Sequence, residues 1–122
     1  MEELELQALG PGDVGRLLAA YQIACDRADE LRATLLLTSP PTTLPPLLRA
    51  LWLDARGDWN GAHNIAQEDD SRDAAWVHAY LHRKEGDAGN AAYWYRRAAR
   101  SPQTGGLDQE WEAIAKSLLD AR

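Results

Sequence analysis

The sequence predicts an all-α fold, a single domain of about five to six helices arranged as stacked antiparallel helical hairpins. Apolar residues recur at intervals of three and four along most of the chain, and no segment alternates at a period of two for long enough to form a strand. Two Gly-Asp pairs, at 57–58 and 86–87, divide helical segments in matching places. A length of 122 residues, with 45% hydrophobic and 26% charged residues, is typical of one soluble globular domain, here residues 1–122.

The first predicted helix follows a loose lead-in over residues 1–12 and continues to about Leu37. Asp13 is placed to cap this helix, because its carboxylate can accept bonds from the first free N–H groups. The apolar stripe of the helix consists of Leu17, Tyr21, Ala24, Ala28, Leu31 and Leu35. Cys25 lies beside this stripe, so we expect a buried, inert thiol. A Thr-Ser-Pro-Pro segment then breaks the helix, because prolines remove N–H donors and disfavour helix before them.

Five more helices are predicted from local start and stop signals. Their approximate bounds are 44–57, 58–67, 71–85, 87–100 and 107–121. Pro45 and Pro46 are tolerated in the first turn of the earliest of these, and Asp58 can cap the next. Either Ser71 or Asp73 opens the following helix. The last helix has one apolar stripe and is polar elsewhere, as expected of a helix that closes a stack against water.

The two Gly-Asp pairs belong to an internal repeat with a spacing of 29 residues. Around them Trp52 aligns with Leu81 and Ala62 aligns with Ala91. The stretches LWLDARGDWNGAHNIAQ and YLHRKEGDAGNAAYWYRRA are therefore two copies of one helix–turn–helix unit. Repeated units of this size predict stacked helical hairpins, with repeat units over about 44–70 and 73–102 and a capping helix over about 107–121.

The second unit resembles tetratricopeptide and Sel-one-like repeats. A small residue on its first helix, Ala79, is placed to face Ala91 on the second, with the Gly-Asp turn between them. The run WYRRAA followed by Pro102 matches the aromatic-Ala-Ala ending and trailing proline of these families. The first unit matches less well, since Ala66 stands where the later aromatic belongs and Asp69 where a small residue belongs.

This resemblance covers about half of the chain and implies a right-handed tetratricopeptide-like array whose usual work is to hold peptides or partner proteins. The pattern GDW..AH followed by W.HAYLHRKEGD..NA.YWYRRA also resembles a family of uncharacterised microbial proteins, which implies no activity. The preference for arginine over lysine and the abundance of alanine suggest a GC-rich bacterial source. Two hairpins make a short array, so dimerisation to extend it is plausible.

The distribution of charge is more informative than its total. The net charge of −6 disfavours a general nucleic-acid binder, which needs clustered cations. Residues 82–100, however, carry five cations against two acidic residues, a local charge of +3. No apolar run approaches the roughly 20 residues of a membrane span, and the N-terminus lacks the basic start of a signal peptide. With a single cysteine, these features predict a cytoplasmic protein without a membrane partner.

The histidines offer one candidate site. His78 and His82 are four residues apart on one helix face, with Glu85 one turn further on. This spacing is compatible with a metal pair, but Ala79 stands where the H-E-x-x-H motif has its glutamate, and a third ligand requires His63 from the neighbouring unit. We therefore expect structural histidines that hydrogen-bond across helices, and neither a metal nor a cofactor.

The predicted helix over 87–100 offers a second candidate. Its apolar face consists of Ala91, Trp94, Tyr95, Ala98 and Ala99. Its opposite face consists of Asn90, Tyr93, Arg96, Arg97 and Arg100. Tyr93 is an aromatic residue among arginines on the side expected to face solvent, and Arg97 can stack on its ring. The arrangement is either a plain surface pair or a basic-aromatic patch that binds an acidic partner segment or a phosphorylated or carboxylate ligand.

The sequence therefore predicts a non-catalytic module that binds a protein or an acidic peptide. It contains no Gly-rich phosphate loop, nucleophile elbow or Cys/His signature, so catalysis is not expected. The core should include Trp76, Val77, Tyr80, Leu81, Trp94 and Tyr95. The alternative is a small-molecule binding protein or minor enzyme with a pocket between the hairpins, formed by His63, His78, His82 and Arg83.

Overall fold

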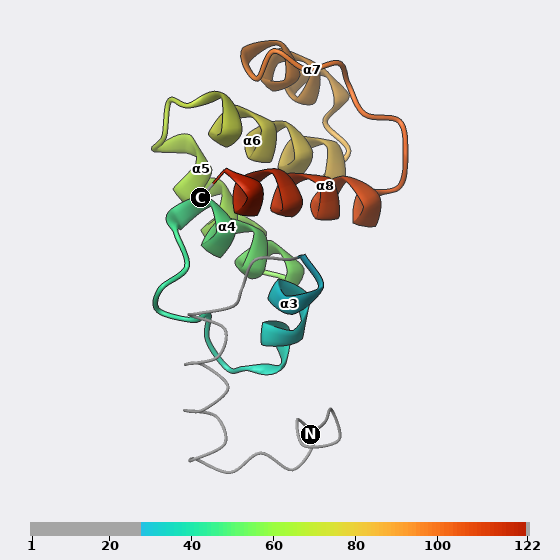
Figure 1. Ribbon diagram of the computed structural model, residues 1–122. Helices are drawn as coiled ribbons and strands as arrows, with labels where there is room; N and C mark the ends of the chain where they lie inside the picture. Colours follow the sequence, from blue (N-terminus) through green and yellow to red (C-terminus); the bar gives the residue numbers. More distant parts are fainter. Residues whose placement is uncertain (1–27, 122) are drawn as a thin grey trace, which may run out of the picture.

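The computed structural model describes residues 28–121, and the regular structure of this part of the chain is entirely helical, as predicted (Figure 1). Its elements are α3 (Ala28–Ala33), the 3-10 helix η1 (Thr34–Leu36), α4 (Pro46–Ala55), α5 (Trp59–Gln67), α6 (Arg72–Lys84), α7 (Ala88–Arg97) and α8 (Leu107–Asp120). Of the predicted first helix, α3 and η1 are described, while Asp13 and Cys25 lie outside the described residues. None of the described helices is long and apolar enough to cross a membrane.

The two Gly-Asp turns have the same geometry, which confirms that the repeated sequence forms a repeated turn. Gly57 and Gly86 both have positive φ angles, of 92° and 91°. In each turn the N–H of the aspartate, Asp58 or Asp87, donates to the carbonyl five residues earlier, at 2.8 and 2.9 Å. Each aspartate carboxylate then accepts from the N–H three residues later, at 2.9 and 3.2 Å, and so caps the next helix.

Other helix ends differ from the expected bounds by a few residues. α4 begins at Pro46 rather than near Leu44, because Pro45 is still extended. Ser71, not Asp73, caps α6, since its hydroxyl accepts the N–H of Ala74 at 3.0 Å. α7 ends at Arg97 rather than at residue 100, because Ala99 has a positive φ angle.

α6 is the central helix of the molecule. Nine consecutive residues of it, from Ala74 to His82, are buried, because it packs against α5 and α7 on some sides and against α4 and α8 on others. The expected core residues Trp76, Val77 and Tyr80 lie in this stretch. Leu81 and Tyr95 are also buried, whereas Trp94 is only half-buried and differs from the prediction.

α8 does not occupy the position expected of a cap at the end of the stack. Its main contacts are with α3, α4 and α6, and Figure 1 shows it lying across α4 and α6. The indole N–H of Trp111 donates to the carbonyl of Leu51 on α4 at 3.0 Å, and the guanidinium of Arg32 lies 4.5 Å from the indole centre. α8 therefore covers the face of α4 and α6 that an open array of hairpins would expose as a groove.

Candidate functional site

All three histidines of the chain converge where α5 meets α6. Nε2 of His78 lies 2.9 Å from Nε2 of His63, and the ring of His82 is centred 5.3 Å from His63 and 4.9 Å from His78. One ring nitrogen from each histidine lies within 4.8 Å of the other two. The helical spacing placed His78 and His82 on one face, and the structure brings to them His63, the third histidine of the alternative pocket.

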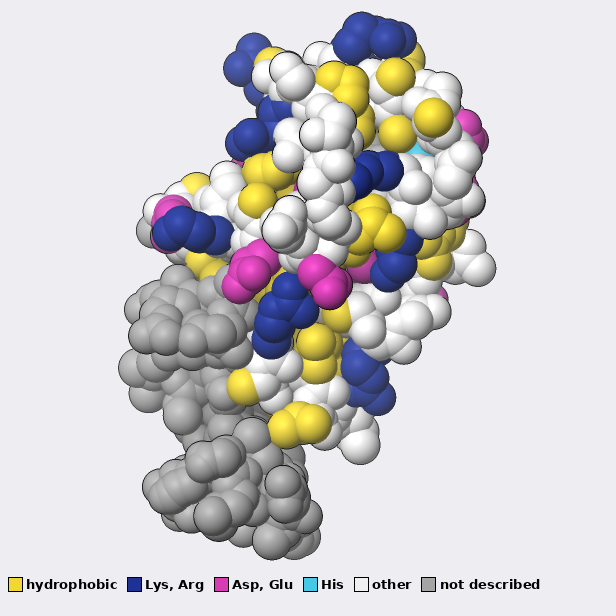
Figure 2. All heavy atoms as spheres, turned by 90° about the vertical axis from the view of Figure 1, so that its right-hand side faces the viewer, with side chains coloured by type: hydrophobic (Ala, Val, Ile, Leu, Met, Phe, Trp, Pro, Cys, Tyr) yellow, Lys and Arg dark blue, Asp and Glu magenta, His cyan; other side chains and the backbone are white. Residues whose placement is uncertain are grey.

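Two tryptophans enclose this trihistidine cluster (His63, His78 and His82). Trp94 of α7 stacks on His78 with ring centres 3.8 Å apart, and Trp59 of α5 stacks on His63 at 4.8 Å. These contacts explain why Trp94 is half-buried: it covers the histidines from outside instead of entering the central core. Only a small area of histidine is visible on the face shown in Figure 2.

Two imidazoles of the cluster, those of His63 and His78, are kept uncharged. Burial, followed by the neighbouring His63 and His82, lowers the pKa of His78 to about 4. Burial also lowers the pKa of His63, with a smaller contribution from His82. Nδ1 of His82 lies 2.7 Å from a carboxylate oxygen of Glu85. At neutral pH, His63 and His78 are therefore neutral and keep a nitrogen lone pair, which is the form that binds metal ions.

Arg83 does not join the histidines, which corrects the alternative pocket expected from the sequence. Its guanidinium donates to Glu110 of α8 at 2.7 Å and to the backbone carbonyl of Gly105. Arg83 follows His82 by one residue, and consecutive helical residues point about 100° apart. The arginine consequently faces α8 while the histidine faces α5.

Sequence reasoning missed Glu110, a buried carboxylate assigned to the polar side of the last helix. It accepts bonds from the indole of Trp76 at 3.0 Å and the hydroxyl of Tyr95 at 2.6 Å, besides the bond from Arg83. Burial and the bond to Glu110 raise the pKa of Tyr95. The only feature of the sequence that indicates the burial of Glu110 is its position directly before Trp111.

Asp54 is a second buried carboxylate that the sequence analysis did not single out. It accepts bonds from the hydroxyl of Tyr80 at 3.1 Å and the ammonium of Lys84 at 3.0 Å. Burial, followed by the neighbouring Asp54, raises the pKa of Tyr80. The feature of the sequence that could have indicated a buried acid is the position of Asp54 directly after the apolar run LWL.

The basic-aromatic face of α7 is present at the surface. Tyr93 is 42% exposed, and Nη1 of Arg97 donates to its hydroxyl at 3.0 Å. The guanidinium carbons of Arg96 and Arg97 each lie 5.9 Å from the centre of the tyrosine ring. Figure 2 shows lysine and arginine side chains gathered at the end of the molecule that α7 forms in Figure 1. The predicted pairing of Tyr93 with Arg97 is therefore confirmed.

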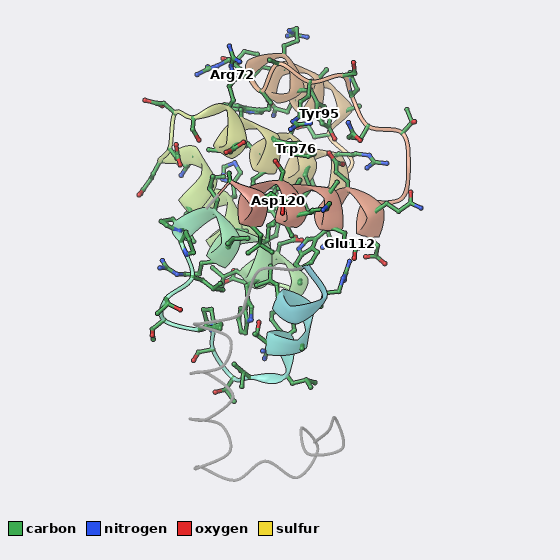
Figure 3. The ribbon with its side chains drawn as sticks, in the orientation of Figure 1. Arg72, Trp76, Tyr95, Glu112 and Asp120 are labelled. Carbon is green, nitrogen blue, oxygen red and sulfur yellow. The ribbon has the colours of Figure 1, made fainter. Side chains whose placement is uncertain are left out.

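Two residues expected on this face are engaged elsewhere. Arg100 lies over the ring of Trp76, 3.5 Å from its centre, beside a surface hollow of about 540 Å³ that Trp76 and Asp120 also line. Figure 3 shows Trp76 on α6 and Asp120 on α8. The side-chain amide of Asn90 donates to Asp87 at 3.0 Å. We therefore define the α7 patch as Tyr93, Arg96 and Arg97.

The described residues thus hold two separate candidates, an enclosed trihistidine cluster and an exposed α7 patch. Comparisons with family models, curated proteins and solved structures find no match to this chain. Because a helical fold hosts many functions, function is argued from the geometry of these two sites.

Proposed function

We propose that the protein is a cytoplasmic, non-catalytic interaction module that binds an acidic segment of a partner protein on the α7 patch. The observation that carries this proposal is the exposed Tyr93, which is flanked by two guanidinium groups at equal distance. Exposed aromatic residues and arginines are the side chains most often found to dominate binding energy in protein interfaces.

The arginines of the patch remain available for a partner's carboxylates. Among residues 28–121, the ion pairs join Arg83 to Glu110, Lys84 to Asp54 and Lys116 to Asp120, and none involves α7. An arginine fork binds a carboxylate through two parallel hydrogen bonds. The bond from Arg97 to Tyr93 already holds one guanidinium in place, which reduces the ordering cost of binding.

The position of α8 favours an outer docking surface over an inner groove. Tetratricopeptide-like arrays, which the second unit resembles, hold peptides in grooves between hairpins, but α8 covers α4 and α6 here. The net charge of −6 also makes a local positive patch selective, because the rest of the surface repels a polyanion that extends beyond the patch, as nucleic acid does. A short acidic peptide is therefore preferred over nucleic acid as the ligand.

The test is a peptide array of short acidic, neutral and basic sequences probed with the full chain. We expect acidic peptides containing an apolar residue to bind. Arg97→Ala and Tyr93→Ala should each weaken binding about 30-fold, equivalent to the roughly 2 kcal/mol lost when an anchor is truncated. Moderate salt should weaken the wild-type contact as well.

Lys116→Ala is the matched control, because Lys116 is an exposed cation on α8 paired only with Asp120 among the described residues. This variant should bind like the wild type. Equal binding by wild type and Arg97→Ala, or a preference for basic peptides, would remove the α7 patch as the binding surface. Sedimentation of the same samples would show whether a second copy of the chain is the partner, as the short array suggested.

The alternative of a small-molecule pocket formed by the three histidines with Arg83 is not favoured. The guanidinium of Arg83 is held by Glu110 and Gly105, so it does not supply a cation beside the imidazoles. A substrate anion at the cluster would lack this partner. The histidines themselves support a different inference.

A further inference from the structure

We propose that His63, His78 and His82 bind one divalent transition-metal ion, with Zn²⁺ as the preferred ion. Two helices from different repeat units bring every imidazole of the chain to one point. Imidazole nitrogens are common ligands of Zn²⁺, and three of them form a known protein site with one open position. This inference is independent of peptide binding at the α7 patch.

The distances between the imidazoles are close to those that a metal ion requires. Two nitrogens bound to a tetrahedral Zn²⁺ at about 2.0–2.1 Å lie roughly 3.3 Å apart. The Nε2 atoms of His63 and His78 are 2.9 Å apart, and the three ligand atoms fall within 4.8 Å of one another. To hold an ion, the three imidazoles would have to move only by the difference between these separations and about 3.3 Å.

The contacts around the cluster orient the imidazoles as ligands. Glu85 holds Nδ1 of His82, which leaves Nε2 of that ring for an ion. A carboxylate that accepts the second N–H of a ligating histidine is the usual outer support of a zinc site and increases the basicity of the ligand. Nδ1 of His78 is buried and has no hydrogen-bond partner among the described residues, so this ring lacks an outer support of that kind.

The protein around the cluster is suited to hold an ion tightly. Trp94 and Trp59 stack on two of the imidazoles and restrict their rotation. His63 is half-buried and provides the approach from solvent. The open fourth position would take a water molecule.

The experiment uses the full chain, stripped of metal with a chelator and titrated with Co²⁺ and then Zn²⁺. We expect one ion per chain, visible d–d absorption of four-coordinate Co²⁺, and loss of that absorption when Zn²⁺ displaces it. The thermal midpoint should rise by several degrees with excess Zn²⁺ and fall again with chelator, because a ligand that binds the native state stabilises it. Absence of one-to-one binding would overturn the proposal.

Matched variants locate the ion. His63→Gln should weaken Co²⁺ binding at least 100-fold, and Glu85→Gln should weaken it about 10–100-fold, the range for outer support residues. Asp69→Asn, in the acidic turn before α6, and Arg97→Ala, in the α7 patch, should bind as the wild type does. Undiminished binding by His63→Gln would place the ion elsewhere and contradict the proposal.

A further measurement does not depend on how the variants fold. The imidazole ¹⁵N resonances of the wild-type protein report only these three histidines, because the chain has no others. All three should shift together on addition of one equivalent of Zn²⁺. Resonances that remain in place would show that His63 and His78 form a hydrogen-bonded pair beside His82, and that the cluster is not a metal site.

Discussion

Glu110 is an acidic side chain of α8 that connects three helices. It is 3% exposed, and its two oxygens accept bonds from Trp76 and Arg83 of α6 and from Tyr95 of α7. A buried charge is tolerated when it is paired and its oxygens are all hydrogen-bonded, as they are here. The same pairing makes the site sensitive, because removing one partner leaves the others buried without a bond.

At this residue the expected effect of a substitution is large. Glu110→Ala should lower the free energy of unfolding by about 3–5 kcal/mol, the range for breaking a buried ion pair. Chemical denaturation at neutral pH measures it. Glu112→Ala is the control on the same helix, since Glu112 is exposed and lies on the other side of α8 from Trp76 and Tyr95 (Figure 3). That change should stay within about 0.5 kcal/mol. A loss in Glu110→Ala as small as that in Glu112→Ala would mean that Glu110 is not buried.

At the scale of an element, the end of α7 departs from the sequence prediction. Ala99 has a positive φ of 59°, and the N–H of Arg100 donates to the carbonyl of Tyr95 at 3.0 Å. This is the hydrogen bond that also ends α4 and α6, where glycine occupies the left-handed position. The prediction extended α7 too far because alanine at that position gives no stop signal. The left-handed residue also redirects Arg100 away from the α7 patch and onto Trp76.

The left-handed alanine can be tested against its glycine counterparts. Ala99→Gly should raise the free energy of unfolding by about 0.5–1 kcal/mol, because glycine adopts positive φ without the clash of a Cβ, partly offset by a more flexible unfolded chain. Gly86→Ala should lower it by about 1 kcal/mol through backbone strain alone, since a Cβ there would meet nothing within 4 Å. Thermal unfolding of the two variants and the wild type measures both changes in the free energy of unfolding. A destabilising Ala99→Gly would contradict the assigned geometry.

At the scale of the whole molecule, α8 joins the two hairpin units into one unit. It packs on α4 of the first and α6 of the second, and its Trp111 is 3% exposed and donates to the carbonyl of Leu51 on α4. Linear repeat arrays gain stability mainly from contacts between neighbouring repeats. Here α8 packs on a helix of each hairpin, so we expect a single cooperative unfolding transition for the described part of the chain.

Paired aromatic truncations test this role of α8. Trp111→Ala should lower the free energy of unfolding by about 3–5 kcal/mol, the range for emptying a large buried aromatic site. Tyr93→Ala, which removes an exposed aromatic of the α7 patch, should change it by no more than about 0.5 kcal/mol. Circular dichroism and tryptophan fluorescence should report coincident transitions in wild-type protein. Two separate transitions would show that the hairpins unfold independently despite α8.

Local patterns in the sequence were sufficient to predict most of the secondary structure. Helical periodicity and the Gly-Asp turns act over only a few residues, so their outcome could be predicted without knowledge of the fold. The cap of α6 was narrowed to Ser71 or Asp73, and the structure shows Ser71. The pairing of Tyr93 with Arg97 is of the same kind, because residues four apart on a helix are neighbours wherever that helix lies. Whether the α7 patch binds a partner is a separate question that the proposed peptide experiment addresses.

The sequence by itself therefore determined the all-α class, the repeated turn and the candidate residues of both sites. Only the tertiary structure decided that His63 meets His78 and His82, that Arg83 leaves them for Glu110, and that α8 lies across α4 and α6. The physical reason is that periodicity shows which face of a helix is apolar but not which other helix that face meets. Contacts between residues far apart in the chain depend on how all the helices pack together, and these contacts placed the histidines in one cluster.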